Sequence, residues 1–180
     1  MAKYLTIDEK APGFVLPNAD GKPVSLVNLL RSGPMVLTWY RGSWCPYCHL
    51  QLRHLQNFLP SFWEAGAVLV ALTPEPPDES LLSWKENWLQ FEVLTDANNL
   101  VARKFGITRP VFEHVTDAIR ESHISELLIE KAVVELPLPA AYVLDTRSIV
   151  RYVFIDEDYR KQADPSKILE VLRGLKSNNI

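Results

Sequence analysis

The chain has 180 residues, of which 47% are hydrophobic and 23% are charged, and its formal net charge is −3. This size suits a single domain over residues 1–180, with or without an insertion. The charge shows no basic excess typical of nucleic-acid-binding proteins, and no apolar run is long enough to cross a membrane. Because residues 1–10 lack the apolar core of a signal peptide, we expect a soluble cytoplasmic protein that binds neither nucleic acid nor membrane.

The first predicted elements are a small β-hairpin and a buried strand. Within residues 11–30, Asp20-Gly21 stands between two apolar runs, a turn signal typical of a hairpin. The segment from Pro34 to Tyr40 is a continuous apolar run, which indicates a central strand covered on both faces. A turn over residues 41–43 then leads to the cysteines.

A long helix is expected to begin at the cysteines and to end at Gly66. Pro46 suits its first turn, because the N–H group that proline lacks has no partner there. Apolar residues recur along this segment at helical spacing, namely Leu50, Leu52, Leu55, Phe58, Leu59 and Phe62. A second buried strand is predicted over residues 67–73.

The next segments alternate between helix and strand. Asp78 can cap a helix that extends to about Leu89, and residues 91–94 suit a short strand. Residues 98–105 suit a short helix that ends before a glycine. Apolar spacing over residues 110–136 suggests helical packing, and we interpret this stretch as an insertion.

The last predicted elements are a second hairpin and a helix. Strands over residues 141–144 and 149–155 flank a turn, and Asp164-Pro165 opens an amphipathic helix. The order of elements predicts an α/β fold, with a mixed central sheet and helices on both faces. It also places Cys45 where a central strand meets the N-terminus of a helix.

The two cysteines of the chain, Cys45 and Cys48, lie three residues apart. A structural disulfide framework would need more cysteines spread along the chain, so this pair indicates redox chemistry or metal binding. A helix N-terminus favours a thiolate, so we expect Cys45 to be the nucleophile with a lowered pKa. Cys48, one turn further on, can attack a mixed disulfide and release the product. Pro46 stiffens the turn, while Trp44 and Tyr47 supply a flat apolar rim for a substrate groove.

Other interpretations of this segment are weaker. Two buried cysteines can merely pack, but the surrounding strand, turn and helix favour a reactive site. The five residues from Cys45 to His49 fit a haem-attachment pattern, yet neither methionine is well placed as a further ligand. A zinc site would need four ligands, and His114 and His123 lie far along the chain. We therefore expect no metal and no cofactor. His49 could exchange protons with the dithiol or simply be solvated.

Several segments together match a known family. The most specific are Trp44–Cys48 and Pro139–Asp145, and the supporting ones are residues 11–17, 20–26, 93–96 and 105–107. On these residues the chain resembles the alkyl hydroperoxide reductase/thiol-specific antioxidant (AhpC/TSA, peroxiredoxin-like) family of the thioredoxin superfamily. The resemblance covers nearly the whole chain and implies a thioredoxin-like fold with an N-terminal β-hairpin extension.

The resemblance also implies functional assignments. It makes Cys45 the attacking thiol, and it equates Pro139 with the cis-proline that faces the dithiol of thioredoxins and lines their substrate groove. It implies a protein disulfide or a hydroperoxide as substrate and a thiol reductant of the thioredoxin or glutathione type as partner. A homodimer is one oligomeric option.

The chain departs from the family pattern around its first cysteine. Peroxiredoxins usually carry Thr or Ser three residues before that cysteine and Pro seven residues before it, where this chain has Gly42 and Thr38. The position of their peroxide-polarising Arg is Pro139. Arg41 lies in the active-site turn and either replaces that arginine or is a surface charge. The buried Asp of thioredoxins is Trp39 here.

The sequence leads to two hypotheses of function. The first is a thiol-dependent oxidoreductase with an antioxidant role, which reduces disulfides or hydroperoxides through a Cys45–Cys48 dithiol/disulfide cycle, with Arg41 and Pro139 in the same site. The alternative is a redox-sensing or binding protein that uses the same pair as a switch. Turnover with a recycling reductant separates them, because a sensor would be oxidised once and stop.

Overall fold

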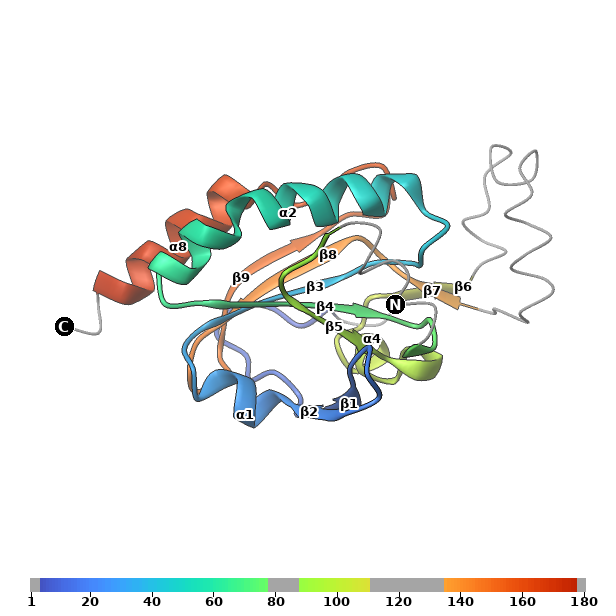
Figure 1. The fold of residues 1–180 in the computed structure, drawn as a ribbon, viewed down its shortest axis with the longest axis horizontal. Helices are drawn as coiled ribbons and strands as arrows, with labels where there is room; N and C mark the ends of the chain where they lie inside the picture. Colours follow the sequence, from blue (N-terminus) through green and yellow to red (C-terminus); the bar gives the residue numbers. More distant parts are fainter. Residues whose placement is uncertain (1–3, 78–87, 111–134, 178–180) are drawn as a thin grey trace.

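The computed structural model describes residues 4–77, 88–110 and 135–177 (Figure 1). Its centre is a five-stranded mixed sheet with the strand order β5-β4-β3-β8-β9. Strands β3, β4 and β5 are parallel, whereas β8 is antiparallel to β3 and β9 is antiparallel to β8. The strands are β3 (Met35–Trp39), β4 (Val68–Thr73), β5 (Glu92–Thr95), β8 (Ala140–Leu144) and β9 (Val150–Ile155). The predicted mixed sheet is thus confirmed.

Helices cover both faces of this sheet (Figure 1). The long helix α2 (Pro46–Glu64) and the C-terminal helix α8 (Pro165–Ser177) lie side by side on one face. Helix α1 (Leu26–Leu30), the 3₁₀ turn η1 (Ala97–Asn99) and helix α4 (Leu100–Lys104) belong to the other face. All five residues of β3 and of β8 are buried, because a strand between two helical layers has no solvent-facing side.

The predicted N-terminal hairpin consists of β1 (Val15–Pro17) and β2 (Pro23–Ser25). Its turn follows from local chemistry. The Asn18 side chain accepts hydrogen bonds from the backbone N–H groups of Asp20 and Lys22, and Gly21 adopts a φ of 76°. The sequence analysis included residues 26–30 in the hairpin, but they form α1. Ser25 caps that helix by accepting the N–H of Asn28 at 3.2 Å.

Two predicted segments lie mainly outside the described residues, namely the helix from Asp78 to Leu89 and the insertion over residues 110–136. The described ends of the insertion are not helical. Strand β6 (Thr108–Pro110) pairs with strand β7 (Glu135–Pro137) in a small antiparallel sheet. Within the described part of the chain, no helix combines the length and the hydrophobicity that crossing a bilayer requires.

Candidate active site around Cys45 and Cys48

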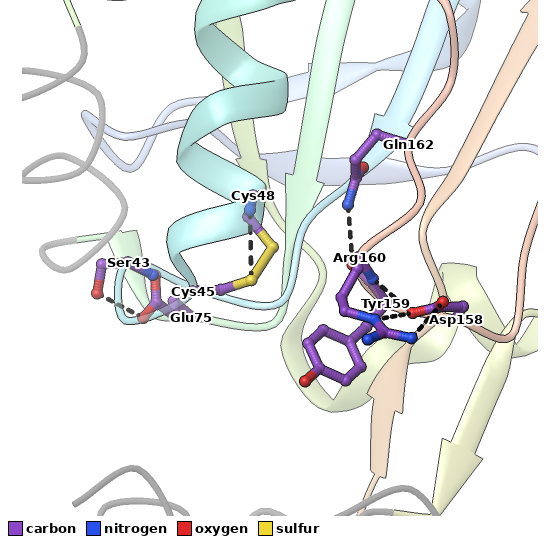
Figure 2. Close-up of a disulfide and its surroundings, with 8 residues drawn as sticks. All are labelled: Ser43, Cys45, Cys48, Glu75, Asp158, Tyr159, Arg160 and Gln162. Atoms are coloured by element: carbon purple, nitrogen blue, oxygen red, sulfur yellow. Dashed lines mark hydrogen bonds and ion pairs between the residues drawn. A yellow bond between two sulfur atoms is a disulfide. The ribbon is translucent and has the colours of Figure 1, made fainter. Parts of the chain in front are cut away.

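The two cysteines lie at the junction of β3 and α2, as the sequence predicts. Cys45 is the N-cap of α2 in an extended conformation, and Pro46 occupies the first helical position. A disulfide joins Cys45 to Cys48, with the Cα atoms 5.3 Å apart, which is within the usual range for such a bond (Figure 2). The backbone N–H of Cys48 points at the Cys45 sulfur at 3.4 Å. The helix N-terminus therefore presents a donor to the sulfur that would carry the negative charge after reduction.

Arg41 is buried in the turn before these cysteines, with only 6% of its surface exposed. Burial lowers the pKa of its guanidinium to about 10, because the charge has lost most of its water. The guanidinium lies over the ring of Tyr159, 4.9 Å from the ring centroid. Among the described residues, no carboxylate pairs with Arg41, and its Nε atom has no hydrogen-bond partner. Arg41 is therefore a buried cation of the site and not a surface charge.

Tyr159 comes from the loop between β9 and α8, and the sequence analysis did not identify it. Its ring meets the ring of Tyr47 edge-on, with 5.6 Å between the centroids. The same loop is fixed by an ion pair of Arg160 with Asp158 and by the hydrogen bond of Tyr4 to Glu157. Figure 2 shows this loop beside the disulfide. Arg41, Tyr159 and Tyr47 thus form one continuous cationic and aromatic wall at the start of α2.

Glu75 lies on the other side of the disulfide and was also not identified from the sequence (Figure 2). It follows β4, and its carboxylate accepts two hydrogen bonds from Ser43, one from the backbone N–H and one from the hydroxyl, both at 2.8 Å. Only 7% of Glu75 is exposed. A buried carboxylate therefore holds the turn that precedes Cys45.

The predicted rim residues Trp44, Pro46 and Tyr47 adjoin the two cysteines along the chain. Pro46 and Tyr47 are exposed at the start of α2, with Tyr47 38% exposed. Trp44 is half-buried and packs against the hydrophobic core under α2. Cys45 itself is only 3% exposed.

Pro139 lies just before β8 and is buried, but the expectation of a cis peptide bond is wrong. The described backbone contains no cis bond. Hydrogen bonds on both sides suit the trans form, since the N–H of Leu138 donates to Ile107 and the carbonyl of Pro139 accepts from Asp156. Ala140 pairs with Trp39 across the sheet, so Pro139 stands beside the end of β3 that leads to Arg41.

Two other departures from the family pattern also have defined places. The Thr38 hydroxyl donates to the carbonyl of Ala140 at 2.9 Å and stays within the sheet. Trp39 packs on the face opposite α2, with its ring 4.9 Å from that of Phe105. Neither side chain can exchange a proton with the dithiol from these positions.

His49 lies in the first turn of α2. Its backbone N–H donates to the carbonyl of Cys45 at 3.2 Å, as expected in the first turn of a helix. Its ring is partly buried, and Nε2 has no hydrogen-bond partner among the residues described. Nothing in these contacts links the ring to either sulfur.

Comparisons with known proteins concern the family and the fold of the chain. The model of the AhpC/TSA family matches residues 7–153. The chloroplastic peroxiredoxin Q of Populus jackii is 26% identical over 92% of this chain and 66% of its own length. The thiol-disulfide oxidoreductase ResA of Bacillus anthracis is 25% identical over 57% of this chain and 59% of its own length. The chain has the same fold as the crystal structure of peroxidoxin BcpB from Mycobacterium tuberculosis, with a TM-score of 0.78 at 24% identity. The superposition covers 96% of this chain and 99% of BcpB.

Proposed function

Since the chain belongs to the AhpC/TSA family of thiol-dependent oxidoreductases, we propose that it is an antioxidant enzyme that reduces hydroperoxides through Cys45 and Cys48. One observation carries this proposal. Cys45 caps α2 with its sulfur facing the N–H of Cys48, while Cys48 is close enough to form a disulfide with it. A stabilised thiolate and a resolving thiol are the two groups that the cycle needs.

The proposed cycle needs no third cysteine. The Cys45 thiolate attacks the terminal oxygen of the hydroperoxide, the O–O bond breaks, and the departing alkoxide takes up a proton to leave as an alcohol. Cys45 is then a sulfenic acid. The Cys48 thiol attacks its sulfur, water leaves, and the Cys45–Cys48 disulfide forms. A thiol reductant of the thioredoxin or glutathione type returns both cysteines to thiols by two exchange steps.

We assign the surrounding residues to supporting roles. Arg41 would stabilise the departing alkoxide, and the support for this is a buried guanidinium with no carboxylate partner among the described residues. Trp44, Pro46 and Tyr47 would form the rim against which substrate and reductant dock. Pro139 would line the groove in its trans form.

The setting of this cycle is also a proposal. A lone pair of cysteines three residues apart suits a reducing compartment, where the dithiol is recycled, so we place the enzyme in the cytoplasm. A homodimer stays a prediction, as a single chain does not test it.

Reduction of protein disulfides is the second candidate. It is favoured by Gly42 and Pro139, which stand where peroxiredoxins carry a hydroxyl and an arginine. In this mechanism Cys45 attacks a substrate disulfide, one substrate thiolate leaves, and Cys48 then releases the second thiolate by closing the disulfide.

The test compares the second-order rates at which reduced protein reacts with hydrogen peroxide, with an organic hydroperoxide and with a model protein disulfide. Peroxide rates well above the disulfide rate support the peroxidase, and the reverse order supports the second candidate. The Cys48→Ser variant should trap a mixed disulfide with a reductant or substrate, and Cys45→Ser should not. Equal trapping by both variants would contradict the assigned roles. Oxidation without turnover in the presence of reductant would indicate the sensor.

A further inference from the structure

Glu75 reaches the active site because β3 and β4 are parallel neighbours in register. Trp39 pairs with Leu72, so Gly42 and Glu75, each three positions after one of these paired residues, emerge side by side. Glu75 is fixed there through its backbone, since its N–H lies 3.3 Å from the Thr73 hydroxyl and its carbonyl accepts from the Thr95 hydroxyl at 2.9 Å. Its position is therefore set by the sheet and not by a flexible surface loop.

The Glu75 carboxylate is packed directly against the turn before Cys45. A Cβ atom added to Gly42 would lie 2.7 Å from Oε1 of Glu75 and 2.5 Å from Nε1 of Trp44. Both carboxylate oxygens accept hydrogen bonds from Ser43. The next link is the N–H of Cys45, which donates to the carbonyl of Gly42 at 3.2 Å. The carboxylate thus holds Ser43 directly and leaves no room for a side chain at position 42, in the turn that places Cys45 at the helix cap.

The charge of Glu75 opposes the other influences on Cys45. The N-terminus of α2 and the buried cation of Arg41 both favour a thiolate, whereas the Glu75 carboxylate, which is bound to Ser43 two positions before Cys45, disfavours it. The Glu75 carboxylate is buried and accepts two hydrogen bonds from Ser43, which are the partners that a buried carboxylate needs. The other titratable or charged side chains on the described elements around the dithiol are Tyr47, His49, Asp158, Tyr159 and Arg160, of which Asp158 and Arg160 neutralise each other as an ion pair.

We propose that Glu75 is a positioning residue of this active site, which holds the Gly42–Ser43 turn and keeps the Cys45 thiol less acidic than the helix N-terminus and Arg41 alone would make it. The inference rests on the proposed function of Cys45 as the attacking thiol. A lower thiol pKa gives more thiolate, but each thiolate is then a weaker nucleophile, so the best attacking thiol has a pKa near the ambient pH. Glu75 would hold Cys45 close to that optimum.

The test measures the pKa of the Cys45 thiol from the pH dependence of its alkylation by iodoacetamide, in the Cys48→Ser background. Glu75→Gln removes the charge and keeps the size of the side chain. We expect it to lower the thiol pKa by about one unit, which raises the thiolate fraction below the pKa roughly tenfold. Ser43→Ala is the matched control, because it removes one hydrogen bond and keeps the charge, and its thiol pKa should change much less.

An unchanged thiol pKa in folded Glu75→Gln protein would overturn the proposal, as would equal shifts in Glu75→Gln and Ser43→Ala. If Glu75→Gln does not fold, Glu75→Ala tests the same claim, because it also removes the carboxylate. The thiol pKa should then shift downward as well, and the absence of any shift would overturn the proposal. Alkylation is independent of the natural substrate, so this result is separable from the test of function. If Cys45 resists alkylation while Cys48 reacts readily in the reciprocal Cys45→Ser variant, the assigned function of Cys45 fails instead.

Discussion

Replacing Arg41 with methionine should stabilise the folded protein and at the same time slow the reaction of Cys45 with peroxide. The side chain is a buried guanidinium, without a carboxylate partner among the described residues, and a buried charge is costly unless it is paired. Methionine fills a similar volume and carries no charge. Such a site retains its charge at the expense of stability, which is expected of a functional group.

The size of the effect follows from the pKa of Arg41. The fall of this pKa from the ordinary arginine value to about 10 corresponds to a penalty of about 3 kcal/mol on the charged folded state, at about 1.4 kcal/mol per pKa unit. At pH 7 the folded and unfolded states both carry the proton, so the penalty is fully present. It is relieved only as the pH rises above about 10, where the folded state loses its proton before the unfolded state does. The variant also loses the cation–π contact with Tyr159, which is worth up to about 2 kcal/mol. A net gain of about 1 kcal/mol is therefore expected.

The measurement is urea unfolding of the oxidised protein at pH 7, for wild type, Arg41→Met and Arg41→Lys. Arg41→Lys keeps the charge and should not be stabilised. In the same preparations, peroxide rates of the reduced proteins should fall about a hundredfold for Arg41→Met. A loss of stability of more than 1 kcal/mol on Arg41→Met, or an unchanged peroxide rate, would refute the idea that Arg41 is a strained functional cation.

Two further predictions concern the scaffold. Gly33→Ala should destabilise the protein by about 2 kcal/mol or more in urea unfolding, because the new Cβ would overlap the backbone carbonyl of Gly66. The control is Gly174→Ala in α8, where the new Cβ meets nothing within 4 Å, and this variant should be neutral or stabilising. Asp145→Asn should lower the free energy of unfolding by about 1–2 kcal/mol at pH 7, because it removes the charge that binds the turn and Arg151. Burial would raise the pKa of Asp145, but the hydrogen bonds from the turn and from Arg151 outweigh it and lower the pKa. Since that lowered pKa makes a contribution present above about pH 4 and lost as the pH falls further, stability of the variant should depend less on pH below 4; an equal acid dependence in both proteins would contradict this.

The elements that were predicted correctly are those marked by a repeated apolar pattern or by a specific turn sequence. The apolar run before the cysteines, the helical spacing after Pro46 and the turn at Asp20-Gly21 each fix one element by local chemistry. Short elements are too short to show a repeated apolar spacing. Helix α1 has only five residues, so the N-cap Ser25 was the signal that could have indicated it. The helix predicted over residues 98–105 starts at Leu100 instead, because Asn98 and Asn99 adopt left-handed conformations. The Asp96 carboxylate accepts the backbone N–H groups of Val101 and Ala102 in its first turn.

The residues of the candidate site also differ in how well the sequence marks them. Cys45, Cys48 and Arg41 were identifiable because they lie within one short segment. Glu75 and Tyr159 come from loops after β4 and β9, and no local pattern marks them. Glu75 could have been identified from its position just after β4, the parallel neighbour of β3. This inference requires the register of β3 and β4, which the sequence alone does not give.

The absence of the family's usual hydroxyl three residues before Cys45 has a structural reason. A threonine at position 42 would place its Cβ against the carboxylate of Glu75 and the indole of Trp44, so the arrangement around Glu75 requires glycine there. The neighbouring Ser43 cannot substitute, because its hydroxyl already donates to Glu75. Peroxide bound beside Cys45 would therefore depend on the N–H groups of α2 and on Arg41 alone. A protein disulfide needs less polarisation, since its leaving group is a thiolate, so loss of Arg41 should reduce the peroxide rate far more than the disulfide rate. The ratio of the two rates in Arg41→Met therefore shows which reaction this rearranged site serves.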